Sequence, residues 1–334
     1  MPMMPTMPRT LPVVQCQLPV MGTEAHVVVV GPPDESHGDQ ARLGQLANLA
    51  AHRLRQLEAR WSRFRLDSEI SRLNRSEGQP VAVSADTLEL VRRGLQAWRV
   101  TSGRYDPTIL YGMVEQGYDA SFEVVQARAD SSPGVNGAHT LIGPRVGGGA
   151  EQVEIDSKRS TVRLGIGVGF DPGGIGKGLA GDLVVGELLA AGAIGALVNI
   201  GGDTVLAGTA PAPSGWQVGI ADVHSPEPGA LQAVVGLSAG AVATSSRLLR
   251  RWHNGDGAHH HLLDPASGQP LDNGLDAVTV LASTGWWAEA LAKAAFVAGA
   301  HHAAAVIAAG GGTGLLVTSD GIAHTLEGLS AHLS

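Results

Sequence analysis

The sequence predicts an α/β (α+β) protein in which mixed or antiparallel sheets pack against helices. Helix-type and strand-type patterns interleave along the chain without a strict alternating β-α period and without an internal repeat. Glycine accounts for 46 of the 334 residues, about twice its usual share, which implies many turns and close backbone contacts. With 44% hydrophobic residues, the chain can bury a large core.

The helices are predicted from apolar residues that lie three to four positions apart. The first of these runs ends in a tryptophan, and Ser84 is a candidate cap for the second. Glycine closes the other two runs, as it commonly does at the C-terminal end of a helix. The predicted helices are 41–64, 87–100, 177–191 and 286–299.

The strands are predicted from short apolar runs bounded by turn residues. They cover 21–30, 194–203, 216–222, 231–238, 241–245 and 277–282. A hairpin over 151–164 turns at Asp156, and 259–265 is the end of a strand that enters a turn. Residues 103–109 are predicted to form a turn, and 128–152 to be irregular.

Charge and cysteine content exclude several classes of protein. A net charge of −8 argues against a nucleic-acid-binding or anionic-membrane surface, although a basic pocket for a small anion is compatible with it. Cys16 is the only cysteine, so one chain cannot form a disulfide framework or a multi-thiolate metal site. The proline-rich start is unlike a signal peptide or a spanning helix, which predicts a cytoplasmic protein without membrane insertion. We expect a flexible tail over 1–14 and a single domain over 15–332.

Lysine is rare in this chain. Arginine occurs 20 times, but the only lysines are Lys158, Lys177 and Lys293. A genome that prefers arginine codons explains the bias. Against that background, a remaining lysine is expected where arginine does not serve, such as at a compact phosphate contact.

The glycine-rich stretch GFDPGGIGKGLAGD (169–182) is the first candidate binding site. It matches neither a P-loop nor a dinucleotide fingerprint, because Asp171 and Gly178 stand where those motifs need other residues. It leads into a predicted helix, whose N-terminus attracts anions, with Lys177 on the first turn. Asp171 should then contact something other than the phosphate. The alternative is a tight glycine turn with an exposed lysine.

A run of three histidines precedes a turn in HHHLLDPASG (259–268). In a strand, His259 and His261 share one face and His260 points away. For His259 and His260, surface or packing roles are the favoured interpretation. His261 lies three residues before Asp264 in a turn shaped by proline and glycine, where it could act as a general base.

These motifs together resemble the ApbE family of FAD:protein FMN transferases over roughly residues 15–330. The resemblance rests on eight segments in the family's order, and 103–119 is most like its actinobacterial branch. The segments are MGT (21–23), WSRFRLDSEISRLN (61–74), GRYDPTI (103–109), DPGGIGKGLAGD (171–182), LVNIGGD (197–203), AVATSS (241–246), HLLDPASG (261–268) and WAEALAKAAFVAG (287–299).

The resemblance implies a phosphoryl transfer and an ApbE-like fold. A threonine hydroxyl of a partner protein attacks the FMN-side phosphorus of FAD, AMP leaves, and Mg²⁺ assists. Lys177 would contact the FAD phosphate, Asp171 the flavin nucleotide, and His261 would take the proton of the threonine. The residues expected to line the FAD pocket are Met21, Phe64, Tyr105, Asp106, Asp171, Lys177 and Leu263.

The predicted metal site departs from the family pattern. The family holds the metal with an aspartate and a threonine four residues apart, together with main-chain oxygens, which corresponds here to Gly174, Gly285, Glu289 and Lys293. Glutamate can coordinate Mg²⁺, but lysine cannot. Three interpretations stay open: a surface Glu–Lys pair, a degenerate site, or an ammonium group of Lys293 in place of the metal.

Three functions follow from these alternatives. The first is an FMN transferase that acts on an unidentified acceptor protein bearing a target threonine. The second is an FAD-binding protein with weak or no transfer. The third is an FAD pyrophosphatase that gives FMN and AMP with water as the acceptor. A homodimer is compatible with each of them.

Overall fold

The computed structural model describes residues 11–33, 37–131, 148–254 and 257–333. An eight-stranded sheet lies at its centre, and all neighbouring strands in it are antiparallel. In spatial order the strands are β1 (Val13–Val20), β2 (Thr23–Val30), β6 (Gly195–Ile200), β7 (Asp203–Gly208), β10 (Gly240–Ser246), β13 (Leu275–Ala282), β14 (Thr313–Thr318) and β15 (Ala323–Thr325). This confirms the predicted class of antiparallel sheet packed with helices.

Two tight hairpins correct the predicted strands. Met21 and Gly22, both at positive φ, join β1 to β2, so the predicted strand 21–30 begins with a turn. Gly201 and Gly202, also at positive φ, divide the predicted strand 194–203 and start β7 at Asp203. This turn was not predicted, because two glycines do not interrupt the hydrophobic pattern of the apolar run.

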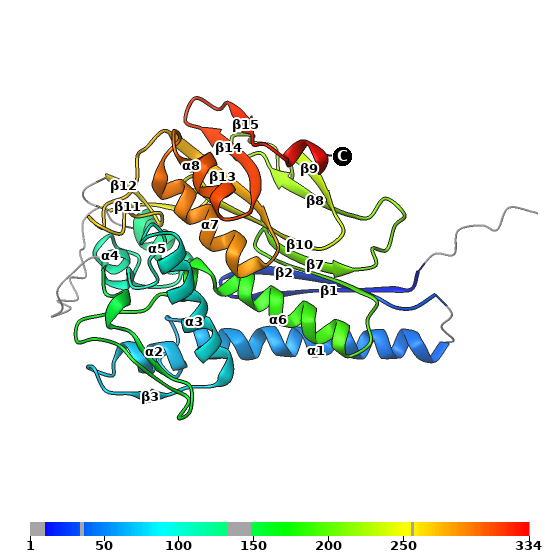
Figure 1. Cartoon of the computed structure of the whole chain (residues 1–334), viewed down its shortest axis with the longest axis horizontal. Helices are drawn as coiled ribbons and strands as arrows, with labels where there is room; N and C mark the ends of the chain where they lie inside the picture. The colour runs from blue at the N-terminus through cyan, green and yellow to red at the C-terminus, as the bar shows by residue number, and fades with distance from the viewer. Residues whose placement is uncertain (1–10, 34–36, 132–147, 255–256, 334) are drawn as a thin grey trace, which may run out of the picture.

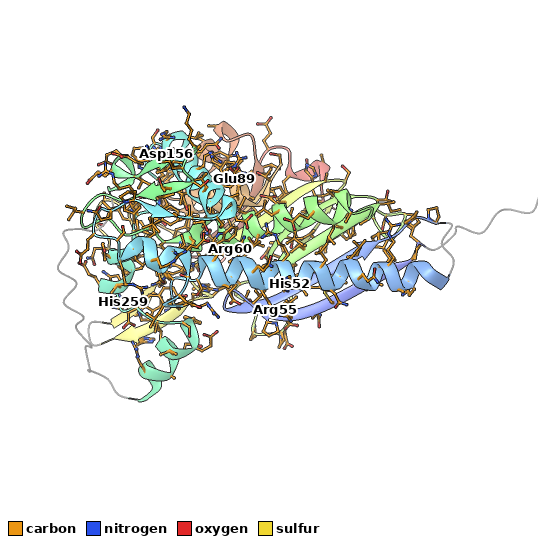
Figure 2. The ribbon with its side chains drawn as sticks, turned by 90° about the horizontal axis from the view of Figure 1, so that it is seen from below. His52, Arg55, Arg60, Glu89, Asp156 and His259 are labelled. Atoms are coloured by element: carbon orange, nitrogen blue, oxygen red, sulfur yellow. The ribbon has the colours of Figure 1, made fainter. Side chains whose placement is uncertain are left out.

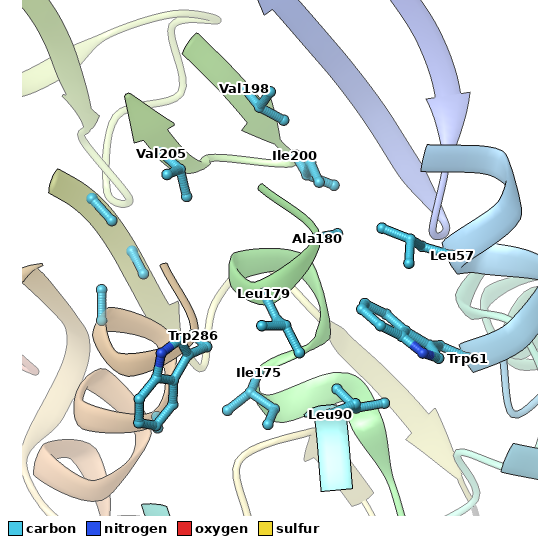
Figure 3. Packing of buried hydrophobic residues seen from close by; sticks show 14 of the residues in the cluster. Leu57, Trp61, Leu90, Ile175, Leu179, Ala180, Val198, Ile200, Val205 and Trp286 are labelled. Carbon is cyan, nitrogen blue, oxygen red and sulfur yellow. The ribbon is translucent and has the colours of Figure 1, made fainter. Parts of the chain in front are cut away.

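Helices cover one face of the sheet (Figure 1). α1 (His37–Trp61) packs on β1 and β2, α6 (Gly176–Ala190) on β6 and β7, α7 (Gly285–Ala298) on β10 and β13, and α8 (Ala303–Ala309) on β14. Figure 3 shows Leu179 and Ala180 of α6 between the sheet, the end of α1 and Trp286 of α7. The main core therefore lies between these helices and the sheet.

The other face of the sheet is covered by a separate hairpin of β8 (Trp216–Ala221) and β9 (Leu231–Leu237). β2 shows how one strand serves both faces. Val27 and Val29 belong to the cluster under the helices, whereas Val28 and Val30 belong to the cluster under this hairpin. This alternation follows from the two-residue period of a strand.

Smaller elements gather at one end of the molecule (Figure 1). They include the capped helix α3 (Ala85–Val100), in which Ser84 accepts a hydrogen bond from the Thr87 amide as predicted. Figure 2, seen from below, shows α1 along this side of the molecule, and His259 at the end where β12 lies. The other elements at this end are α2 (Glu69–Asn74), α4 (Leu110–Glu115), α5 (Phe122–Ser131), β3 (Val81–Ala82), β4 (Glu154–Asp156), β5 (Thr161–Arg163), β11 (Arg251–Asn254), β12 (Gly257–His260) and two 3₁₀ turns, η1 (Ala150–Gln152) and η2 (Pro172–Gly174). A third 3₁₀ turn, η3 (Leu329–Ala331), lies near β8 and β9 instead (Figure 1).

Most predicted helices and strands are present, with shifted ends. The four predicted helices correspond to α1, α3, α6 and α7, and the hairpin of β4 and β5 turns after Asp156. The prediction of irregular structure over 128–152 is wrong at both ends, which lie in α5 and η1, while 132–147 is outside the described residues. β1 was not predicted, and it includes residues 13 and 14 of the expected tail; residues 1–10 of that tail are outside the described residues.

Candidate functional site

Segments from five parts of the chain enclose a cavity of ≈ 330 Å³. They are the β1–β2 turn, the chain after α1, the turn before α4, the glycine-rich stretch, and the chain after β12. Together with α7 they bring most of the predicted site residues to one cavity. Those that line it are Met21, Phe64, Tyr105, Asp106, Asp171, Gly174, Lys177, His261, Leu263 and Lys293. Of the other two, Glu289 contacts Lys177 and Lys293, and Gly285 contacts Gly178.

The glycine-rich stretch forms one wall of the cavity. Asp171 caps η2 by accepting a hydrogen bond from the Gly173 amide at 2.7 Å, and its other oxygen lies 3.3 Å from Nε of Arg63. Asp171 was expected to contact a group other than phosphate, and that group is the guanidinium of Arg63. Gly174 faces the ring of Tyr105, because a Cβ there would lie 2.5 Å from the ring.

Lys177 lies on the first turn of α6, as predicted, and its side chain is 20% exposed. Its ammonium group pairs with Asp203, the first residue of β7, and lies 3.6 Å from Oε1 of Glu289. Burial lowers the pKa of Lys177 to about 8, although Glu289 opposes that shift. Lys177 is therefore mainly protonated at neutral pH and faces the cavity as a cation.

Glu289 lies between two lysines. Its side chain is 1% exposed, and Oε2 accepts a hydrogen bond from the Gly178 amide at 2.8 Å. Oε1 accepts one from Nζ of Lys293 at 3.4 Å and also faces Lys177. Burial alone would raise the pKa of Glu289, but the two lysines outweigh it and hold this pKa below its usual value.

These contacts do not fit the predicted metal site. Mg²⁺ prefers an octahedron of oxygen ligands. Both oxygens of Glu289 already accept hydrogen bonds, and the ammonium group of Lys293 lies beside one of them. Gly285 packs against the backbone of Gly178. The donor set favours a bound ammonium group over a divalent cation.

Asp182, the last residue of the glycine-rich motif, fixes the helix that carries Glu289 and Lys293. Its carboxylate accepts hydrogen bonds from the amides of Gly285 and Trp286, at 2.7 and 3.0 Å. It therefore caps the N-terminus of α7 from α6. Burial raises the pKa of Asp182 to about 6, against the opposing effect of the two amide bonds.

His261 lies one residue beyond β12, at the cavity wall. Its Nδ1 is buried without a hydrogen-bond partner among the described residues. Burial, helped by Arg250, lowers its pKa well below the usual value, so the ring is neutral at physiological pH. The other two histidines have packing roles, as expected: His259 stacks on Trp252, and His260 is bound to the main chain of Leu271 and Leu262.

One end of the cavity is aromatic. The guanidinium of Arg63 lies over the rings of Phe64 and Tyr118, at 4.3 and 4.7 Å from their centroids. Leu263 is buried in the same apolar cluster as Tyr118. This end offers flat apolar surface and a planar cation, which suits a large planar ring system.

Tyr105 and Asp106, which are neighbours in the turn before α4, have different surroundings. Asp106 accepts hydrogen bonds from Thr108 and from the Gly148 amide, so it holds its own loop as well as lining the cavity. Tyr105 has a buried hydroxyl with no partner among the described residues. Burial raises the pKa of Tyr105 well above its usual value, which keeps this hydroxyl a hydrogen-bond donor.

Sequence reasoning missed three polar residues of the site. Arg63 and Arg250 line the cavity, and Asp203 pairs with Lys177, which also lines it. Arg63 lies within the segment 61–74 that carries the resemblance, but no role was assigned to its side chain. Asp203 could have been found, because it ends the motif LVNIGGD.

No helix in the described parts of the chain is long and apolar enough to cross a bilayer.

Comparisons with known proteins identify the family of this chain. A model of the ApbE family matches residues 21–316. The FAD:protein FMN transferase of Vibrio cholerae is 28% identical over 287 residues, which cover 84% of this chain and 80% of that protein. The FAD:protein FMN transferase of Haemophilus influenzae is 26% identical over 256 residues, which cover 74% of this chain and 70% of that protein.

Solved structures share the fold. The ApbE protein of Thermotoga maritima superposes with a TM-score of 0.79 at 23% identity, covering 96% of this chain and 99% of that one. The apo form of the flavinyl transferase ApbE of Pseudomonas stutzeri gives a TM-score of 0.76 at 25% identity, covering 95% of each chain. The likeness therefore extends over nearly the whole chain.

Proposed function

The chain belongs to the ApbE family, and we propose that it is an FAD:protein FMN transferase, which moves FMN from FAD to a threonine hydroxyl of a partner protein. One observation carries the proposal: a single cavity is lined by a cationic lysine, a neutral histidine and an aromatic end. The lysine suits the diphosphate of FAD, the histidine suits the attacking hydroxyl, and the aromatic end suits the flavin ring. The proteins of this name among its relatives support the assignment.

In the proposed complex, Lys177 binds the FAD diphosphate at the N-terminus of α6. Its ammonium group supplies a positive charge where negative charge builds up on the phosphoryl oxygens. Phe64 and Leu263 contact the flavin, and the unpartnered hydroxyl of Tyr105 donates a hydrogen bond to the ligand. Asp171 acts through Arg63, which it orients toward the flavin end.

His261 is the proposed general base. The threonine hydroxyl gives its proton to the imidazole as its oxygen forms a bond to the FMN-side phosphorus. The bond between that phosphorus and the bridging oxygen breaks, and AMP leaves with the oxygen and its electron pair. Because the ring is neutral and its Nδ1 has no described partner, it can accept a proton. No step is assigned to a divalent metal, because the surroundings of Glu289 do not fit one.

A transfer assay separates this proposal from the other two functions. The purified chain is incubated with FAD and an extract of the cells that carry it, and AMP, free FMN and protein-bound flavin fluorescence on denaturing gels are measured. A transferase gives AMP and a fluorescent protein band in equal amounts. AMP with free FMN alone indicates a pyrophosphatase, and binding of FAD without AMP indicates a flavin-binding protein. Either of these results contradicts the proposal.

A further inference from the structure

We propose that this cavity binds the FAD diphosphate without a divalent metal ion, with the ammonium group of Lys293 in the position that a metal would need. The inference rests on the proposed FAD site and concerns how its charge is neutralised. It is carried by the contacts of Glu289 with two lysines and one amide.

The ammonium groups of Lys177 and Lys293 lie close to one carboxylate oxygen. Nζ of Lys177 and Nζ of Lys293 lie 3.6 and 3.4 Å from the same oxygen of Glu289. Both lysines line the cavity, and their side chains are 20% and 19% exposed. The buried carboxylate of Glu289 thus holds two ammonium groups side by side at the cavity wall, and Asp203 pairs with Lys177 as well.

Glu289 is not free to bind a metal. Its Oε2 accepts a hydrogen bond from the Gly178 amide, which fixes the plane of the carboxylate. A divalent ion at Oε1 would meet the ammonium group of Lys293 at close range, and the two cations would repel each other. A metal could enter only after Lys293 had moved away from its partner.

Contacts between α6 and α7 fix the positions of the two lysines. Gly178 and Gly285 bring α6 and α7 into backbone contact, and Asp182 ties the start of α7 to α6. The two lysines therefore sit on elements that are rigidly joined. Asp203 and Glu289 already balance the two charges, and a preorganised pair of ammonium groups can donate hydrogen bonds to a diphosphate without the cost of reordering when FAD binds.

The experiment is calorimetric titration of the full chain with FAD, once with EDTA and once with Mg²⁺. We expect equal affinity in both conditions for the unchanged protein. Lys293→Met should lower the affinity by roughly 10- to 100-fold in both, because one charged contact to phosphate is lost. Lys293→Thr should lower it similarly in EDTA and recover part of it with Mg²⁺, because threonine offers an oxygen beside Glu289. Lys158→Met, at an exposed turn, is the matched control and should bind like the unchanged protein.

The outcomes distinguish this inference from the proposed function. Binding of FAD by the unchanged protein only when Mg²⁺ is present would overturn the inference and leave the FAD site intact. No binding in either condition would overturn the proposed function as well. Because the comparison of EDTA with Mg²⁺ needs no variant, poor folding of a substituted protein cannot hide the answer.

Discussion

A Cβ atom on Gly178 would lie 2.2 Å from both the carbonyl carbon and the carbonyl oxygen of Gly285. The first turns of α6 and α7 are therefore in backbone contact, and this contact brings Lys177 to Glu289. Any side chain at position 178 has to push the two helices apart. The geometry of the proposed phosphate site thus depends on two glycines that carry no functional group.

Gly178→Ala should destabilise the protein by about 1–3 kcal/mol, the usual cost of overpacking a core, and should also weaken FAD binding. Gly186→Ala is the matched control on the same helix. A Cβ there meets nothing within 4 Å, so alanine should raise the free energy of unfolding by up to about 1 kcal/mol. Urea unfolding of both variants checks this, and equal stability of the two would contradict the described helix contact.

Glu289→Gln should be strongly destabilising. The substitution keeps an acceptor for the Gly178 amide but removes the negative charge between Lys177 and Lys293. Breaking such a buried charge arrangement typically costs about 3–5 kcal/mol. Glu115→Gln, at an exposed position of α4, should change the free energy of unfolding by less than about 0.5 kcal/mol. A loss at position 289 no larger than at position 115 would show that the lysines do not depend on this carboxylate.

Tyr105→Phe should separate stability from binding. Its hydroxyl is buried without a partner among the described residues, so removing it should leave the protein as stable as before or more stable by up to about 1 kcal/mol. If the hydroxyl donates to bound FAD, the same variant should bind FAD roughly tenfold more weakly. Thermal unfolding and FAD titration test the two parts, and unchanged FAD affinity would remove Tyr105 from the proposed binding site.

The ionisation of His261 should lower the stability of the protein as the pH drops below about 6.5. In the unfolded chain His261 takes up a proton near that pH. In the folded protein burial holds the pKa of His261 well below it, so the unfolded state binds more protons. One such group lowers the free energy of unfolding by up to about 1.4 kcal/mol per pH unit.

His261→Asn should therefore remove this contribution, so that the slope of unfolding free energy against pH between 6.5 and 5 is smaller in the variant than in the unchanged protein. Two other groups act in the same range. Burial lowers the pKa of His260, which adds to the fall in stability, and raises the pKa of Asp182 to about 6, which opposes it below pH 6, so the slope of the variant is compared with that of the unchanged protein. Urea unfolding at a series of pH values gives the slope. An unchanged slope would show that His261 is protonated in the folded state, which would also argue against its role as a base.

Local signals predicted a large part of this fold. α6 and α7 follow from apolar runs that end at glycine, and α3 from Ser84 and the helical period after it. The short helices α2 and α4 were not predicted, because six residues hold too little of a helical period. The order of strands in the sheet was also not predicted, since it depends on pairings between residues far apart in the sequence.

The sequence predicted which residues form the site, but it did not predict how they contact one another. The motifs identified Lys177, Asp171 and His261 as chemistry-bearing residues. The pairing of Lys177 with Asp203 depends on a two-glycine hairpin turn that the apolar pattern concealed. The engagement of both oxygens of Glu289 depends on the packing of α6 against α7, which no local pattern encodes.

The central claim is that the cavity around Lys177 is an FAD site, and an equilibrium titration with FAD, followed by flavin fluorescence, tests it most directly. The unchanged protein and Lys158→Met should bind FAD equally well. Lys177→Met should bind it at least roughly 10- to 100-fold more weakly, with its folding confirmed by circular dichroism. Equal affinity of Lys177→Met and the unchanged protein, or no binding of FAD to either, would contradict the account.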